Sequence, residues 1–380
     1  MSATRSPVPD SAAHAALPCA IAARPSPPQV RPRLVKRLFG SRISALLTIV
    51  ISALLALTLP ALAWWALLQA TPPWGEASAC AQRAGACWPF LVEKAPLILF
   101  GTYDYAERWR PALASALILA LAGATLFAPR APRRLLVAWL AALVAFVVLM
   151  KGGVFGLPEV PTARWNGLPV LLFLAAFGLA LAFPLGLLLA LARAARMPLV
   201  AGAATALIEF LRGVPMVSVL FFGVFVLPLL VPGGRIDPLY AALVALVLFH
   251  AAYVAEDVRG GLQSVPRGQF EGAMSIGLGY WPMMRLVVLP QALRAATPAL
   301  TNTAIGGLKD TSLVVIVGLH DLMSTAKMAY NDPLWQRHAL EAYVFVGALF
   351  FVLCWALSAA GRRLEHGPVL RARQMAPLPS

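Results

Sequence analysis

The sequence predicts an all-α polytopic membrane protein with about eight transmembrane helices, and three observations support this fold class. Hydrophobic residues make up 60% of the 380 residues and charged residues only 12%, a composition far too apolar for a soluble domain. Long stretches, of which residues 43–68 and 135–150 are the clearest, carry no charge. These stretches are apolar at consecutive positions and do not alternate, which argues against a membrane β-barrel.

The predicted spans are stretches near the ~17–25 residues that a tilted helix needs to cross a bilayer. They are residues 43–68, 112–128, 135–150, 169–192, 213–231, 238–255, 298–318 and 341–360. Eight crossings place both termini on one side of the membrane, and in this arrangement the whole formal excess of +15 lies on that side. Loops rich in Lys and Arg stay in the cytoplasm, so the basic character indicates topology rather than nucleic-acid binding.

The first part of the chain is predicted to be accessory. Residues 1–42 are rich in Pro and Arg without apolar periodicity, which predicts a disordered cytoplasmic tail. Residues 43–167 form an accessory transmembrane region with a long periplasmic segment at 69–111. Cys80 and Cys87 fall in that segment, where a disulfide and two free thiols are both compatible with the sequence.

A second domain is predicted at residues 168–362, and a basic cytoplasmic tail follows at 363–380. The first span of this domain has a small residue at every fourth position, which lets a neighbouring helix approach closely. That neighbour could belong to the same chain or to another subunit. The residues are Gly178, Ala182, Gly186, Ala190 and Ala194.

Charged side chains mark the edges of the fifth and sixth spans. Glu209 and Arg212 are three residues apart, and therefore share one helix face just before a Gly and a Pro. They are interpreted as a membrane-edge ion pair that shapes the entry to the fifth span. The residues given a structural role at these two edges are Glu209, Arg212, Gly213, Pro215, Glu256 and Arg259.

A hydrated loop is predicted at residues 257–297, because this stretch is too polar and too rich in Gly and Pro to cross lipid. A loop of this length between two spans usually contacts a partner. Its motif residues are Glu271, Gly272, Ala273, Gly277, Leu289 and Pro290. Their spacing resembles the EAA loop of ABC importer permeases, which forms a short coupling helix in a groove of a cytoplasmic ATPase. The resemblance implies that Glu271 caps or orients this helix and that Gly277 permits the turn after it.

Polar residues also fall near the centre of the seventh predicted span, at Lys309, Asp310, Thr311 and Ser312. A charge at this depth costs at least ~2.5–3.5 kcal/mol, so such residues usually face a bundle interior or a water-filled route. In one interpretation the two charges are satisfied by neighbours and fix the helix register. In the other they lie on the path of a zwitterion, which needs one group of each sign. His250, in the middle of the sixth span, is interpreted as a hydrogen-bonded packing residue.

Signatures of catalysis are absent from the sequence. There is no G-x-x-x-x-G-K-[ST] loop, no Cys/His set with metal-ligand spacing and no nucleophile arrangement in a hydrated segment. The sequence therefore predicts no enzyme, no catalytic residue, no metal site and no cofactor in this chain. Energy must come from a partner or from an ion gradient.

Three motifs in order, E-F-L-R-G-V-P, A-Y-V-A-E-D-V-R-G-G-L and the EAA loop, resemble the polar amino-acid ABC permeases. With its long N-terminal extension, the chain resembles the M-type permease of the general L-amino-acid uptake family. This resemblance implies a type-1 importer permease core with an N-terminal three-helix extension, located in the bacterial inner membrane. It also implies ABC ATPase subunits that bind ATP, a related Q-type permease and a periplasmic amino-acid-binding protein as partners.

Other functions fit parts of the sequence. An ion-coupled secondary transporter would need an inverted repeat, and no convincing similarity links the first four spans to the last four. A membrane anchor without transport is disfavoured by the charges within the seventh span. An ABC permease for another small polar solute would retain the same loop. A Walker-A ATPase and a secreted binding protein encoded beside this chain would favour an importer over the first two.

Overall fold

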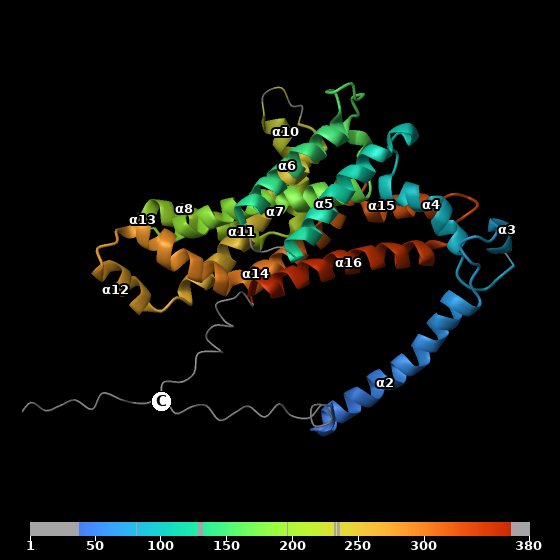
Figure 1. Cartoon of the computed structure of the whole chain (residues 1–380), viewed down its shortest axis with the longest axis horizontal. Coiled ribbons are helices and arrows are strands. Elements are labelled where there is room, and N and C mark those ends of the chain that lie inside the picture. Colours follow the sequence, from blue (N-terminus) through green and yellow to red (C-terminus); the bar gives the residue numbers. More distant parts are fainter. Residues whose placement is uncertain are drawn as a thin grey trace, which may run out of the picture. The chain divides into compact units, whose positions relative to one another are not determined.

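The computed structural model describes residues 38–80, 82–127, 132–195, 197–231, 233 and 236–365. These residues form helices and connecting loops without any strand, which confirms the all-α prediction (Figure 1). Most of the two predicted tails, 1–42 and 363–380, lies outside the described residues. The long helices are α2 (Arg42–Ala63), α4 (Trp88–Phe100), α5 (Trp109–Phe127), α6 (Pro132–Lys151), α7 (Leu168–Arg193), α8 (Pro198–Gly213), α11 (Pro238–Gln263), α14 (Leu289–Asp310) and α16 (Ala339–Glu365).

Shorter elements connect the long helices. The α-helical ones are α3 (Ala77–Cys80), α9 (Met216–Phe221), α10 (Leu227–Leu230), α12 (Arg267–Ser275), α13 (Tyr280–Met283) and α15 (Leu322–Tyr330). The 3-10 and π segments are η1 (Trp64–Leu68), η2 (Tyr105–Glu107), η3 (Thr162–Arg164), η4 (Phe222–Val226), η5 (Met284–Val288) and η6 (Thr311–Val317).

The chain divides into two compact units, residues 1–64 and 65–380. In the first unit, α2 has no buried residue, although it is apolar around its whole circumference. It begins after Ser41, whose hydroxyl accepts a hydrogen bond from the Ser44 backbone N–H at 3.1 Å. A helix that is apolar on every side is suited to a lipid environment.

The core of the second unit is built on α7 and α11, which make its most extensive helix–helix contact. Gly186 explains how close they come: a Cβ there would lie 2.6 Å from the Ala251 carbonyl oxygen. Four of the five small residues predicted to form a stripe on α7 are buried, namely Gly178, Ala182, Gly186 and Ala190. Gly178 and Gly186 face α11, so the stripe contributes to packing within the chain.

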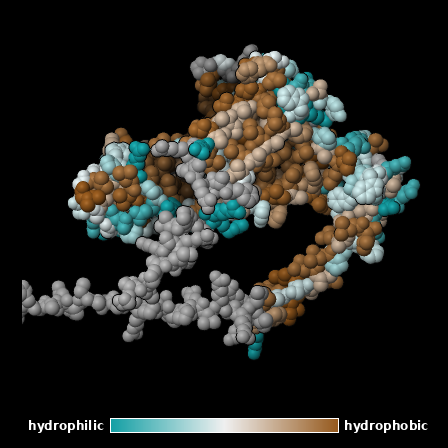
Figure 2. Space-filling view, viewed as in Figure 1, coloured by the Kyte–Doolittle hydropathy of each residue, from teal (hydrophilic) through white to brown (hydrophobic). Residues whose placement is uncertain are grey.

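Helices occupy all eight segments predicted to span the membrane. By length and composition alone, five helices among the described residues could cross a bilayer, or six if a bent pair counts as one span. Helix α14 is not among the five, because it carries Gln291, Arg294, Lys309 and Asp310. Apolar side chains cover most of the face of the second unit seen in Figure 2.

The bent pair corrects the predicted fifth span. Helix α8 and the segment Met216–Leu230 differ in direction by 108°. The break lies at Val214 and Pro215, where the backbone is extended, because Pro215 cannot donate the hydrogen bond that would continue α8. The span therefore starts after Pro215 and not at Gly213, and α8 is a separate helix preceding it.

The second unit has α12 and α13 at one end and α4 and α15 at the other (Figure 1). At the α4 end, Cys80 and Cys87 form a disulfide. The backbone N–H of Cys87 donates to the buried Glu341 carboxylate on α16 at 2.9 Å. Lys94 donates to Asp332 at 2.7 Å, and this contact raises the pKa of Lys94 and lowers that of Asp332. Residues preceding α7 are thus attached to the helices that follow it.

Candidate functional site

Helix α12 projects beyond the ends of α11 and α14, within the predicted loop at 257–297 (Figure 1). It begins after Pro266, and no side chain caps its first turn. Glu271 lies inside the helix with its side chain exposed. Glu271 does not cap the helix, because it follows the helix start by four positions and its side chain is exposed, whereas the orienting role also predicted for it stays a prediction.

Buried apolar contacts hold α12 on the rest of the unit. Ala273, at the third motif position, is 4% exposed and belongs to a cluster with Met284 and Val288 of η5 and Ala292 of α14. A polar contact adds to this attachment, since the Gln291 amide of α14 donates to Gln269 of α12 at 2.9 Å. A displacement of α12 would therefore be passed directly to the start of α14.

The turn after α12 depends on Gly277, which has a φ of +81°. Its N–H donates to the Met274 carbonyl at 2.9 Å, and the next N–H, of Leu278, donates to the Ala273 carbonyl at 3.2 Å. These two bonds satisfy carbonyls at the helix end, which requires a left-handed residue. Leu289 and Pro290 lie at the start of α14, which continues without a break from the π segment η5.

The outer surface of this end is unusually apolar for a hydrated loop. Met274 is 56% exposed, Ile276 75% and Trp281 70%. Exposed apolar side chains gathered on one projecting element are typical of a protein-binding surface.

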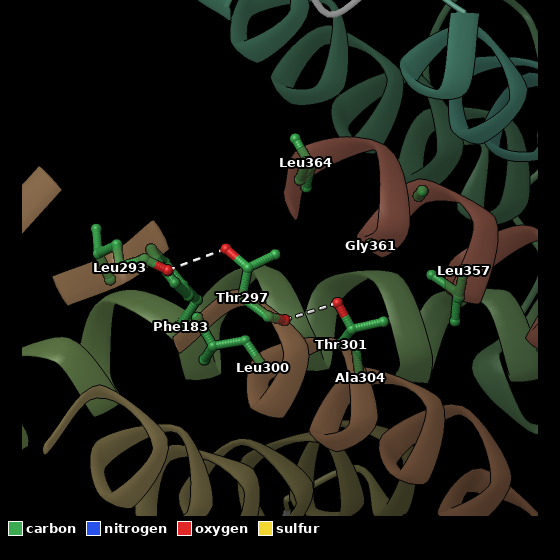
Figure 3. Close-up of a pocket in the computed structure, with 10 residues that line it drawn as sticks. Phe183, Leu293, Thr297, Leu300, Thr301, Ala304, Leu357, Gly361 and Leu364 are labelled. Atoms are coloured by element: carbon green, nitrogen blue, oxygen red, sulfur yellow. Dashed lines mark hydrogen bonds between the residues drawn. The ribbon is translucent and has the colours of Figure 1, made fainter. Parts of the chain in front are cut away.

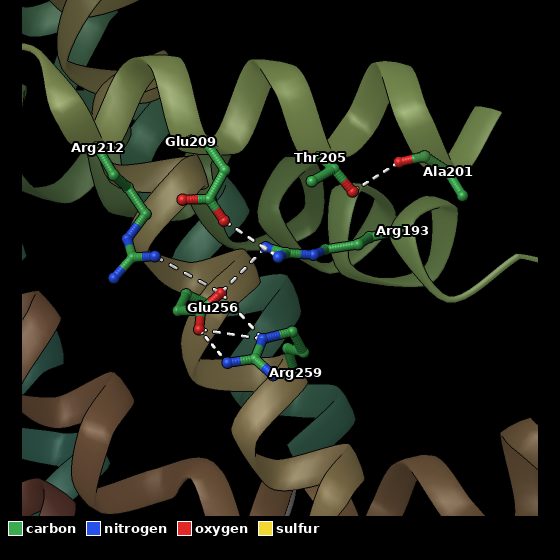
Figure 4. Close-up of polar contacts among 7 residues, drawn as sticks. All are labelled: Arg193, Ala201, Thr205, Glu209, Arg212, Glu256 and Arg259. Carbon is green, nitrogen blue, oxygen red and sulfur yellow. Dashed lines mark hydrogen bonds and ion pairs between the residues drawn. The ribbon is translucent and has the colours of Figure 1, made fainter. Parts of the chain in front are cut away.

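A network of charged side chains joins α7, α8 and α11 at the same end (Figure 4). Arg193 of α7 donates to Glu209 of α8 at 3.0 Å and to Glu256 of α11 at 3.2 Å. Glu256 also accepts hydrogen bonds from Arg259 and lies 3.6 Å from the guanidinium of Arg212. The Glu256 carboxylate thus offsets part of the positive charge of Arg193, Arg212 and Arg259, and these contacts link α7, α8 and α11.

This network corrects the predicted membrane-edge pair. Within the described part of the chain, Glu209 and Arg212 do not form an ion pair with each other. Glu209 pairs with Arg193, and Arg212 lies close to Glu256. Arg212 also lies over the Tyr253 ring, 5.6 Å from its centre. The sequence analysis missed Arg193 as a partner, since its contacts are 16 and 63 residues away along the chain.

A second polar cluster lies halfway along α11. His250 is the 13th of the 26 residues in α11, and its Nε2 is 3.2 Å from Asp310 Oδ2. Asp310 is the last residue of α14, where the helix continues into η6. The predicted span at 298–318 thus consists of the end of α14 and the 3-10 segment η6, and Asp310 lies level with the middle of α11. His250 acts as the partner of Asp310, a contact that the sequence analysis did not anticipate.

The other predicted path residues surround this contact. Lys309 is exposed and has no ion-pair partner among the described residues. Thr311 is fully buried and donates to the Leu308 carbonyl at 2.7 Å, whereas Ser312 is half-buried. The structure thus keeps the predicted residues at one level of the bundle but does not pair Lys309 with Asp310.

A hollow of about 360 Å³ lies between α7, α14 and α16 (Figure 3). Its polar atoms are already used, because Thr297 donates to Leu293 at 3.0 Å and Thr301 donates to Thr297 at 2.8 Å. Phe183, Leu300 and other apolar side chains complete the lining. Both hydroxyl hydrogens are therefore used, and no charged side chain lines the hollow, so it offers nothing to pair with the charged groups of an amino acid; the path candidates lie outside it.

The chain is similar in sequence to known membrane transport proteins. Residues 182–367 match the family model described as binding-protein-dependent transport system inner membrane component. The inner membrane amino-acid ABC transporter permease protein YhdY of Escherichia coli K12 is 44% identical over 337 residues, covering 87% of this chain and 90% of that protein. The glutamate/glutamine/aspartate/asparagine transport system permease protein BztC of Rhodobacter capsulatus is 36% identical over 60% of this chain and 53% of that protein.

A crystal structure of an amino acid ABC transporter with histidines is 30% identical, covers 53% of this chain and 91% of that chain, and has a TM-score of 0.47. The similarity to YhdY extends well beyond the residues matched by the family model. Together with the projecting α12 between two long helices, it shows that this multi-pass chain belongs to the family of inner membrane components of binding-protein-dependent transport systems.

Proposed function

We propose that this chain is the permease subunit of an ATP-driven ABC importer that carries L-amino acids across the bacterial inner membrane. The observation that carries the proposal is α12, a short helix that projects from the bundle and is fixed to α14 through Ala273. Two relatives whose names state amino-acid transport, YhdY and BztC, support the substrate class.

In this proposal, an ABC ATPase subunit binds the exposed surface of α12, including Met274 and Ile276. The ATPase binds and hydrolyses ATP, and this chain needs no cofactor of its own. Closure of the ATPase dimer displaces α12, and the buried contacts of Ala273 pass that displacement to α14. Two rigid bundles moving about a central site would then give alternating access.

The substrate path in this proposal passes the middle of α11. Lys309, Asp310, Thr311 and Ser312 line it, since charged groups at this depth are usually functional. The exposed face of α14 supports this placement, because Asn302 and Lys309 are exposed two turns apart on the same side. A polar stripe on a spanning helix requires water or a polar partner beside it.

The proposal includes a set of partners. A related Q-type permease would form the second half of the path, two ATPase subunits would bind the cytoplasmic side, and a periplasmic amino-acid-binding protein would deliver the substrate. Both termini and α12 would face the cytoplasm, which the excess of positive charge on that side supports. The remaining surface of the spans contacts membrane lipid.

Uptake of labelled L-amino acids tests the function, in a strain that lacks its own amino-acid uptake systems and expresses this chain with the ATPase and binding protein encoded beside it. Uptake should require the ATPase and should survive an ionophore. Uptake that stops with the ionophore and persists without the ATPase would instead identify an ion-coupled transporter. If another small polar solute is imported and no amino acid is, the chain is still an importer permease, but the proposed substrate class is wrong.

The coupling contact has its own test. A cysteine at Ser275 should crosslink to the ATPase, since Ser275 is exposed at the end of α12. Accessibility of the same cysteine only from the periplasm would contradict the proposed orientation.

A further inference from the structure

His250 lies between two hydrogen-bond acceptors. Its Nδ1 is 2.8 Å from the Leu246 carbonyl oxygen and its Nε2 is 3.2 Å from Asp310 Oδ2. The residue is only 5% exposed. A carbonyl oxygen can only accept, so Nδ1 carries a hydrogen and donates it. In a neutral imidazole with hydrogen on Nδ1, Nε2 is itself an acceptor.

An ionised Asp310 facing an unprotonated Nε2 would oppose two acceptors at hydrogen-bond distance. One proton therefore lies between them. Either an imidazolium donates to a carboxylate, or a carboxylic acid donates to a neutral imidazole. Both arrangements give the pair a net charge of zero. Gly307 makes the approach possible, since a Cβ there would lie 3.1 Å from Nε2.

Among the described residues, neither His250 nor Asp310 has an ion pair with any other side chain. Helix α7 carries a charge only at Arg193, at its far end, and the described α9, η4 and η6 carry none. On α11, the next carboxylates are Glu256, which is bonded to arginines, and Asp257, two turns from His250 and bonded to Thr303 at 2.6 Å. Among the described residues, Lys309, adjacent to Asp310 in sequence, is thus the charged side chain without an ion-pair partner at the depth of His250 and Asp310.

We infer that His250 sets the charge preference of the substrate path. By neutralising Asp310, it leaves the Lys309 ammonium as the net charge, so the path favours amino acids with an added side-chain carboxylate over neutral ones, and disfavours cationic ones. This inference rests on the proposed function and names the substrate class for the same path. His250 is a positioning residue here, because it acts through Asp310 and need not touch the substrate.

The shared proton can be observed directly in the purified full chain in lipid nanodiscs. Nitrogen NMR reports whether Nε2 carries hydrogen, with the His250 signal assigned by its loss in His250→Gln. Infrared absorption reports a protonated carboxyl, assigned by its loss in Asp310→Asn. A proton on either group is expected. An unprotonated Nε2 together with an ionised Asp310 would overturn the inference.

Transport gives the second test, with L-glutamate and L-glutamine as probes of equal size that differ by one charge. The complete transporter, with its ATPase and binding protein, is compared in proteoliposomes. His250→Gln leaves Asp310 ionised, so the glutamate-to-glutamine rate ratio should fall roughly tenfold, because an uncompensated carboxylate then repels the added charge of glutamate. The double variant His250→Gln/Asp310→Asn should restore the ratio. Because the ratio is independent of protein level, a partial folding defect does not move it.

Asp257→Asn is the matched control, a charge removal on the same helix that should leave the ratio unchanged. A wild-type ratio in His250→Gln, or glutamine transport without glutamate transport by the wild type, would overturn the inference. If the wild type transports neither these nor any other amino acid, the proposed function itself fails.

Discussion

Gly261 of α11 and Ala292 of α14 are in backbone contact: a Cβ on Gly261 would lie 2.3 Å from the Ala292 carbonyl oxygen. Ala292 belongs to the same buried cluster as Ala273 of α12. The crossing of α11 and α14 is therefore adjacent to the point where α12 is attached, and its geometry depends on the absence of a side chain.

Gly261→Ala should destabilise the protein by about 1–3 kcal/mol, because backbone at this distance cannot yield to a methyl group. Gly260→Ala is the control, since the neighbouring glycine has no heavy atom within 4 Å of its Cβ position. Thermal unfolding in detergent and the amount of protein in the membrane measure both. Equal stability of the two variants would mean that α11 and α14 can move apart at this contact without a loss of folding free energy.

Gly277→Asp should abolish uptake while leaving membrane insertion intact. A side chain at a φ of +81° costs ~1–2 kcal/mol, so the turn that positions α12 should change locally. Gly272→Ala is the comparison on the same helix, since nothing lies within 4 Å of its Cβ position and alanine favours helix. Normal uptake by Gly277→Asp would remove α12 from the coupling pathway.

Glu256→Gln should lower both thermal stability and uptake, by about 1–3 kcal/mol in stability, because three arginine side chains lose their shared anion. Glu209→Gln should have less effect, within ~1 kcal/mol, since the Glu209 side chain is 56% exposed and, among the described residues, its ion pair is with Arg193. Limited proteolysis between α7 and α8 would show whether α8 detaches. Similar losses for both variants would contradict the central position of Glu256.

The Lys94–Asp332 pair predicts a pH dependence at the α4 end. The lowered pKa of Asp332 means that its stabilising effect is present above the ordinary value of ~3.9 and is lost as pH falls through the folded-state value below it. The raised pKa of Lys94 means that its effect is present below ~10.4 and is lost at still higher pH.

The difference in melting temperature between wild type and Asp332→Asn should therefore be constant from about pH 5 to 9 and decrease below pH 4. Differential scanning fluorimetry across this range measures it. A difference that changes near neutral pH would show that another group, and not this pair, controls the stability of the α4 end.

Much of the fold was predictable because long apolar runs have few alternatives to spanning helices. Helices occupy most of each of the eight predicted segments, and the left-handed Gly277 follows a helix as the motif implies. The long-range contacts were not predictable. Arg193 was read as one of many basic residues, and His250 as a packing residue. Their partners lie 60 or more residues away, at Glu256 and Asp310, and no local pattern reports such pairs.

Two predictions failed because of the local backbone conformation. The start of the fifth span was placed at Gly213, because hydropathy does not register the loss of a hydrogen bond at Pro215. The resemblance implies that Glu271 caps or orients α12, but the capping position is occupied by Pro266, five residues before Glu271, so only the orienting role is left. In both cases backbone geometry decides the outcome, and side-chain character alone does not reveal it.

The close approach of α7 and α11 at Gly186 has a consequence for conformational cycling. Rotamer changes normally absorb small shifts between packed helices, but here the Ala251 carbonyl and the β-branched Val254 side chain lie directly against Gly186, which has no side chain to adjust. The two helices must then travel as one rigid body between transport states. The 108° bend at Val214–Pro215 is a place where the chain already changes direction between helices, so differences between states are expected there.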